Sequence, residues 1–208
     1  MISEQISIEG VARSASGGAT VIAVVGLCGT GKSEAVGYLE RNLSAPVVYF
    51  GGVVLSEVQR RGLEVSAANE RIVRESIRAT GGMSAIAGLA AADIESALRN
   101  SPRLVIDGLY SFAEYELLKA KYGRGLVLLA IHSARHLRYA RMAIRKVRPL
   151  SAREVDDRDL TEIKNLDKGG PIAIADFHII NDGTVEALHA QLADVVRQIE
   201  QRAQETTA

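Results

Sequence analysis

Short apolar runs rich in β-branched residues alternate along this chain with longer segments that carry apolar residues at helical spacing. The short runs are bounded by glycine, proline and other turn residues, and they predict five strands. These strands are TVIAVVG from Thr20, Val47–Phe50, Leu104–Asp107, Gly125–His132 and Phe177–Ile180. The fourth is almost continuously apolar, as expected where both faces of a parallel sheet are covered. Because strands alternate with helices, the pattern predicts an α/β fold with a parallel sheet.

The segments at helical spacing predict eight helices. They are Lys32–Leu43, Val53–Arg61, Ala67–Ala79, Ser84–Arg99, Ala113–Lys121, His136–Val147, Asp159–Leu166 and Val185–Ala203. Three of them lie between the second and third strands and form a helical insertion of about residues 52–100. The polar stretch Arg148–Arg158 is predicted to be mobile. Residues 1–19 end in the small polar sequence SASGGA, which we expect to be a flexible lead-in to one domain of residues 20–208.

Composition narrows the classes of function. A chain of 208 residues fits one α/β domain of ordinary size. Its 25 basic and 25 acidic side chains balance, so we expect no nucleic-acid partner. Cys28 is the only cysteine, which excludes an internal disulfide and agrees with a reducing, cytoplasmic location. We expect no membrane segment, because the most apolar internal run, Met83–Ile94, is too short and too rich in Ala and Gly. The oligomeric state stays open.

The glycine-rich segment after the first strand matches the phosphate-loop pattern G-x-x-x-x-G-K-[ST]. Its predicted ATP-binding residues are Gly26, Leu27, Cys28, Gly29, Thr30, Gly31, Lys32 and Ser33. The glycines let backbone N–H groups turn inward around phosphates, and the following helix adds the positive end of its dipole. We expect Lys32 to neutralise the outer phosphates and the Ser33 hydroxyl to bind Mg²⁺. The alternative is a glycine-rich turn before a helix, but the flanking elements favour a site for ATP and Mg²⁺.

An acidic residue, Asp107, ends the third predicted strand. The carboxyl ends of parallel strands meet at one edge of the sheet, which is where ligands bind, so Asp107 is expected beside the phosphate loop. There it would hold Mg²⁺, partly through water, or accept a proton from an attacking hydroxyl. The alternative is a helix or turn cap before Gly108.

Arginines recur at three- and four-residue spacing from Arg138 to Arg148, and this spacing places Arg141 and Arg145 on one helix face. Guanidinium groups from a mobile segment can close over a phosphoryl group in transfer and share its negative charge. Arg141 and Arg145 therefore join Lys32 and Asp107 as candidate catalytic residues. An ordinary solvated basic face is an equally good explanation of the spacing.

The chain resembles the P-loop nucleoside monophosphate kinases, and more closely ATP-binding proteins similar to dephospho-CoA kinase. The likeness covers Thr20 to Gln198 and rests on GLCGTGKS, FGGVVLSEVQRRGLE, VIDG, RYARMAIRKVR and IADFHIINDGT. It implies a three-layer P-loop NTPase fold with strand order 2-3-1-4-5, a lid at about residues 145–158 and acceptor binding by the helical insertion. It also implies that Arg141 lies against the adenine, Arg145 lies near the phosphates, and Asn181 and Gly183 form the adenine edge.

The acceptor side departs from that family. Where nucleotide kinases carry Gly-Asp and then an arginine, this chain has Gly51-Gly52 and Leu55, and an aromatic followed by Pro-Arg is missing after Gly108. Replacement candidates for binding the acceptor are Arg60, Arg61, Arg74 and Arg78, of which Arg78 is preferred. Each is otherwise a solvated charge. A charged cluster that follows the lid could read the nucleotide or could be an ordinary helix end; it comprises Arg158, Asp159, Glu162 and Lys168.

These residues lead to the hypothesis of a Mg²⁺-dependent kinase that moves the γ-phosphoryl group of ATP to a small phosphorylated acceptor, a nucleoside monophosphate or a dephospho-CoA-like molecule. The alternative is a nucleotide-binding regulatory ATPase or switch with a protein partner. The missing acceptor arginines favour the switch, and the helical insertion favours the kinase.

Overall fold

The computed structural model describes residues 19–205. The flexible lead-in expected over residues 1–19 therefore lies almost wholly outside the described residues. No helix among those described is long and apolar enough to cross a membrane.

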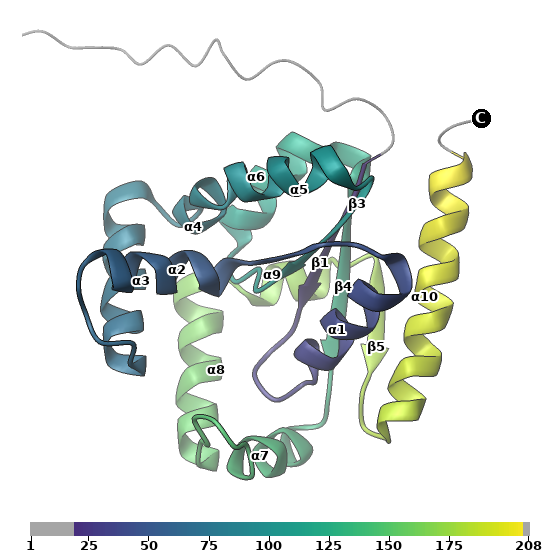
Figure 1. Ribbon diagram of the computed structural model, residues 1–208. Coiled ribbons are helices and arrows are strands. Elements are labelled where there is room, and N and C mark those ends of the chain that lie inside the picture. The colour runs from purple at the N-terminus through teal and green to yellow at the C-terminus, as the bar shows by residue number, and fades with distance from the viewer. Residues whose placement is uncertain (1–18, 206–208) are drawn as a thin grey trace, which may run out of the picture.

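Five parallel strands form one sheet at the centre of the molecule (Figure 1). They are β1 (Thr20–Val25), β2 (Val47–Tyr49), β3 (Arg103–Asp107), β4 (Leu126–His132) and β5 (Phe177–Ile180). Their order is β2-β3-β1-β4-β5, so the predicted order is confirmed. Each of the four strand pairs is parallel, and the central strand β1 pairs with β3 and β4.

Helices cover both faces of the sheet, which gives three layers (Figure 1). They are α1 (Lys32–Leu43), α2 (Phe50–Arg60), α3 (Ala67–Gly81), α4 (Ala85–Leu89), α5 (Ala91–Asn100), α6 (Phe112–Tyr122), α7 (Arg135–Ala143), α8 (Ala152–Leu166), α9 (Gly169–Ala173) and α10 (Val185–Glu205). Alternate residues of β1 divide between two cores. Ile22 and Val24 pack with α1 and α10, and Val21 and Ala23 pack with α2, α4 and α6. The central strands β1, β3 and β4 are almost wholly apolar because both of their faces are buried, whereas the edge strand β5 exposes His178 and Ile180.

Several boundaries differ from the sequence predictions. β2 ends at Tyr49 and α2 begins at Phe50, while the helix expected over Ser84–Arg99 is interrupted at Ala90. The five-residue helix α9 was not predicted.

The largest differences lie between β4 and β5. The helix expected to reach Val147 ends at Ala143, and the next two apolar side chains, Ile144 and Val147, are 82% and 65% exposed. Without apolar surface to bury, nothing holds a further helical turn. The segment expected as mobile is helical from Ala152, because Ser151 caps α8 through a reciprocal capping box.

Candidate functional site

The glycine-rich segment connects β1 to α1 in a conformation that requires glycine. Gly26 and Gly31 have φ of 144° and 96°, in the region that side chains rarely adopt. A Cβ on Gly31 would lie 2.3 Å from the Asn181 amide nitrogen, and one on Gly26 would lie 2.4 Å from the Ile131 carbonyl oxygen. The backbone of β4 and the Asn181 side chain of the β5–α10 turn thus pack closely against the loop and leave no room for a side chain at these two positions.

The carbonyl groups of the loop accept hydrogen bonds from side chains, whereas the loop N–H groups donate none within the described residues. Leu27 O accepts hydrogen bonds from Thr30 Oγ1 at 3.0 Å and Lys32 Nζ at 2.8 Å, and Thr30 O accepts from Asn181 Nδ2 at 2.9 Å. Within residues 19–205, no backbone N–H group from Leu27 to Ser33 donates a hydrogen bond. A row of unpaired N–H groups at a helix N-terminus is the arrangement that binds phosphates.

Lys32 and Ser33 begin α1 directly beneath this loop. Burial lowers the pKa of Lys32 from its ordinary 10.5 to about 7, and the positive charge of Lys168 acts in the same direction. A buried ammonium group next to a second one is unfavourable unless an anion joins them. Ser33 is exposed, so its hydroxyl is open to a ligand.

Asp107 lies at the carboxyl edge of the sheet, as the sequence indicated. It ends β3, opposite Val24 of β1 and Tyr49 of β2. Burial raises the pKa of the Asp107 carboxyl group, while the charges of Lys32 and Lys168 lower it. Together with the Ser33 hydroxyl, Asp107 supplies the hard oxygen donors that suit Mg²⁺, which keeps several water ligands.

Arg141 joins the phosphate loop to the turn after β5. Its Nη2 donates to Asn181 O at 2.9 Å, and its Nη1 donates to Ser133 Oγ at 3.0 Å and to Gly29 O at 3.4 Å. Asn181 is buried, and Gly183 is exposed two residues further on. Arg141 and Asn181 therefore lie together against the loop, and Gly183 follows in the same turn.

Arg145 does not share a helix face with Arg141, because α7 ends at Ala143. This is a correction to the paired arginines expected from the spacing; Arg145 is exposed. Arg138 is the arginine of α7 that faces inward. Its Nη1 donates to Cys28 O at 3.1 Å and its Nη2 to Asp159 Oδ2 at 2.7 Å.

Asp159 of α8 completes this contact by accepting a 3.6 Å hydrogen bond from Cys28 Sγ. The Arg138 and Asp159 side chains are only 6% and 5% exposed. Asp159 thereby holds α8 against the phosphate loop. Sequence reasoning gave this pair no structural role, because its members are 21 residues apart and 131 residues separate Asp159 from Cys28.

The rest of the charged cluster extends from α8 to α9. Glu162 Oε1 accepts from Arg158 Nε at 2.9 Å, and Glu162 Oε2 accepts from Lys168 Nζ at 2.5 Å. Lys168 also lies 4.5 Å from the centre of the Tyr110 ring, and Tyr110 follows Asp107 by three residues. This cluster, for which the sequence left nucleotide recognition and an ordinary helix end equally open, acts electrostatically on Lys32, and its Lys168 acts on Asp107.

The candidate acceptor arginines have different environments. Arg60 makes a forked ion pair with Glu57 and is exposed, and Arg61 contacts the same carboxylate. Arg78 lies 3.6 Å from the buried Glu114 carboxylate. Arg74 is half-buried between these positions and has no ion-pair partner among residues 19–205.

The helical insertion also contacts the segment after α7. Glu70, one turn before Arg74 in α3, accepts two hydrogen bonds from Arg148. The insertion and the α7–α8 connection thus meet on the α3 face that carries Arg74.

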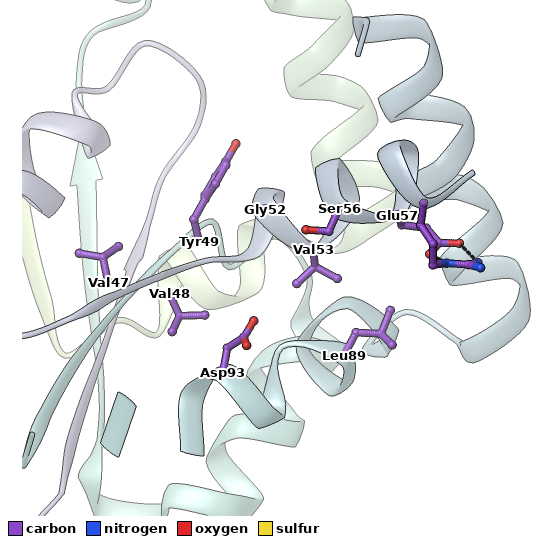
Figure 2. A pocket seen from close by; sticks show the side chains of 10 residues that line it. Val47, Val48, Tyr49, Gly52, Val53, Ser56, Glu57, Leu89 and Asp93 are labelled. Carbon is purple, nitrogen blue, oxygen red and sulfur yellow. Dashed lines mark hydrogen bonds and ion pairs between the residues drawn. The ribbon is translucent and has the colours of Figure 1, made fainter. Parts of the chain in front are cut away.

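A pocket of about 510 Å³ lies over the outer edge of β2 (Figure 2). Val53, Ser56 and Glu57 of α2 form one wall, and Leu89 and Asp93 form the other. Its lining contains neither Asp107 nor any phosphate-loop residue.

The fold is that of P-loop kinases. A shikimate kinase from Bacteroides thetaiotaomicron superposes with a TM-score of 0.57 at 12% identity, over 87% of this chain and 98% of that one. A gluconokinase from Sinorhizobium meliloti 1021 superposes with a TM-score of 0.53 at 13% identity, over 90% and 99% of the two chains. At these identities the likeness establishes the fold alone.

Sequence comparison gives closer relatives. No protein-family model matches the chain. A UPF0200 protein from Thermococcus onnurineus (strain NA1) is 32% identical over 182 residues, which cover 86% of this chain and 97% of that protein. A UPF0200 protein from Methanosarcina barkeri (strain Fusaro) is 30% identical over 85% of this chain and 94% of that protein. The chain therefore belongs to the UPF0200 family.

Proposed function

We propose that this protein is an ATP- and Mg²⁺-dependent phosphotransferase. The observation that carries the proposal is the row of N–H groups from Leu27 to Ser33 that donate no hydrogen bond within residues 19–205, together with the half-buried Lys32 in the same loop. A loop of this form has no structural use for its free donors, and a phosphate chain satisfies them together. The kinase fold supports phosphoryl transfer as the reaction.

Each residue of the candidate site has its own role in the proposed reaction. The loop holds the α- and β-phosphates, and Lys32 neutralises charge on the β- and γ-phosphates. Ser33 and Asp107 would hold Mg²⁺, partly through water, and the ion would supply positive charge to the phosphate oxygens. An acceptor oxygen bonds to the γ-phosphorus as the bond to the β–γ bridging oxygen breaks, and ADP leaves. If the acceptor is a hydroxyl, its proton passes to an Asp107 carboxylate oxygen.

The proposed acceptor is a small phosphorylated molecule, such as a nucleoside monophosphate or a dephospho-CoA-like compound. Residues of the insertion, about 52–100, would bind it, with the segment at about 145–158 as a lid, and the Glu70–Arg148 contact supports such closure. Of the candidates, Arg74 has no carboxylate partner among residues 19–205, whereas Glu57 pairs with Arg60 and Arg61, and Glu114 lies 3.6 Å from Arg78. We place the reaction in the cytoplasm, where MgATP is supplied.

The test is ADP formation from ATP and Mg²⁺ with a panel of nucleoside monophosphates, deoxynucleotides, dephospho-CoA and small hydroxy acids. We expect one compound to stimulate ADP formation in the wild type and not in Lys32→Ala. Equal stimulation in Lys32→Ala would refute the assignment. The variant should bind ATP at least tenfold more weakly and remain folded.

The second candidate function is a nucleotide-dependent switch that acts on a protein. The carboxylates beside Arg60, Arg61 and Arg78 favour it, because three of the four candidate arginines are paired with an acidic side chain. Its test is the affinity of a partner from the same cell extract with ATP or ADP bound. Tight ATP binding without stimulation by any compound would support this function instead.

A further inference from the structure

Lys168 and Glu162 form a buried ion pair. Glu162 lies in α8, and Lys168 immediately precedes α9. The Lys168 side chain is 2% exposed and the Glu162 side chain 9%. Lysine is almost never buried to this degree, and removing two charges from water costs several kcal/mol per ion. Apolar side chains of similar size would stabilise such a position as well or better. The pair therefore calls for a reason other than stability.

Glu162 uses its second oxygen to hold Arg158. Lys168 Nζ donates a hydrogen bond to Glu162 Oε2 at 2.5 Å, and Arg158 Nε donates one to Glu162 Oε1 at 2.9 Å. Both carboxylate oxygens are thus fixed, and so is the plane of the Arg158 guanidinium group. Because Nε carries that contact, the two terminal amino groups of Arg158 are left without a hydrogen-bond partner among residues 19–205.

Arg158 is in place to reach the phosphate loop. The next residue, Asp159, contacts Cys28 in the middle of the loop, so this turn of α8 lies against it. The charge of Arg158 acts on Lys32, Cys28 and Tyr110, which surround the phosphate site. Its side chain is 42% exposed, unlike that of Lys168, so a ligand can approach it.

The other arginines near the loop either have their guanidinium groups in hydrogen bonds with the protein or lie away from the loop. Arg138 is buried against Asp159. Arg141 donates hydrogen bonds to Gly29 O, Ser133 Oγ and Asn181 O. Arg145 lies beyond the end of α7 and is exposed. Among these, only Arg158 combines a fixed guanidinium plane with free terminal donors.

We propose that Arg158 contacts the phosphoryl group in transfer, and that Glu162 and Lys168 are positioning residues that hold its guanidinium group. This inference rests on the proposed function and adds a catalytic arginine and its support to it. Planar terminal N–H groups match the oxygens of a phosphoryl group, and the negative charge that develops there is what Arg158 would stabilise.

The experiment compares two probes: ADP with Mg²⁺, and ADP with Mg²⁺ and fluoroaluminate, which imitates the phosphoryl group in transfer. Arg158→Gln should weaken binding of the fluoroaluminate complex by about ten- to a hundredfold and leave ADP affinity within about twofold. Arg153→Gln is the matched control, because Arg153 is on the same helix, is 92% exposed, and should change neither affinity. Equal affinities in Arg158→Gln and the wild type would overturn the proposal.

The positioning role is tested by replacing both buried partners, Glu162→Met with Lys168→Met. Since an apolar pair avoids an unpaired buried charge, the double variant should unfold at a temperature close to that of the wild type. It should nevertheless lose about tenfold or more in fluoroaluminate affinity, because Arg158 is no longer held. A double variant with wild-type affinity would show that the pair does not position Arg158.

Arg158→Lys separates charge from placement, since lysine keeps the charge and lacks the Nε donor. It should behave as Arg158→Gln does; full affinity in Arg158→Lys would overturn the positioning role. The proposed function fails separately, if the wild type binds neither probe or if Lys32→Ala binds both as the wild type does.

Discussion

The affinity for ATP should fall as pH rises above 7, because Lys32 must be charged to hold phosphates. In the nucleotide-free protein, burial and then the charge of Lys168 lower the pKa of Lys32 to about 7. A bound triphosphate favours the charged amine and returns its pKa toward the ordinary 10.5. Between these two values, binding must therefore take up a proton.

The size of the effect follows from the two pKa values. Above pH 7 each pH unit should cost up to about tenfold in affinity, until the pH approaches the pKa in the complex. From pH 7.5 to pH 9.5 the dissociation constant should rise by about fifty- to a hundredfold. Phosphate groups with a second pKa of about 6 are already ionised over this range, so ATP itself contributes little.

Calorimetry at pH 8 in buffers of different ionisation enthalpy measures the proton directly. We expect an uptake close to one proton per ATP bound in the wild type. Lys32→Met removes the titrating amine and should show a weaker but nearly pH-independent affinity by fluorescence titration. An uptake near zero in the wild type, or an unchanged slope in Lys32→Met, would refute the reasoning.

Three further results are expected. Gly31→Ala adds a Cβ where the loop leaves no room, so it should lower the free energy of unfolding in urea by about 2–4 kcal/mol. The control is Gly37→Ala, in the middle of α1 and without a positive φ, which should instead raise that free energy by up to about 1 kcal/mol. Asp159→Asn should cost about 3–5 kcal/mol by leaving the Arg138 charge buried, and adding Arg138→Met should recover most of that loss; no recovery would contradict the ion-pair argument. Burial followed by the Asp159 charge raises the pKa of Cys28, which is 6% exposed, so iodoacetamide should label it at least tenfold more slowly at pH 8 than after unfolding in urea; equal rates would contradict its burial.

Local signals predicted the sheet and the glycine-rich connection between β1 and α1. Short apolar runs bounded by turn residues favour buried strands, and the strand order that the resemblance implied is the order of the sheet. The loop glycines and Lys32 carry their chemistry in a short stretch of sequence, and Asp107 follows from the end of a strand. Each of these depends on residues that are neighbours in the chain.

The segment from α7 to α9 was harder for two physical reasons. Helical spacing continues through Ile144 and Val147, but spacing does not reveal that both side chains have nothing to pack against. The helix that follows does carry a readable signal, since Ser151 and Glu154 have the spacing of a capping box. That signal was outweighed by the polarity of the stretch.

Long-range ion pairs left no local signal at all. Lys168 looks like a surface lysine in any window of sequence, because its burial depends on Glu162, Tyr110 and the packing of α9. The same holds for the contact of Asp159 with Cys28, which joins opposite ends of the domain in sequence. Such contacts become visible only when the fold brings the helices to the loop.

The charge distribution around the loop explains why these pairs lie where they do. Lys32, Lys168 and Arg158 place three positive charges near one another, and the carboxylates of Glu162 and Asp107 offset only two of them. Burial is the main cause of the lowered pKa of Lys32, and the positive charges of Lys168 and Arg158 lower it further. Under the proposed function, a bound triphosphate would offset these positive charges. The groups that lower the pKa of Lys32 would then also favour a polyanion, whichever acceptor the protein uses.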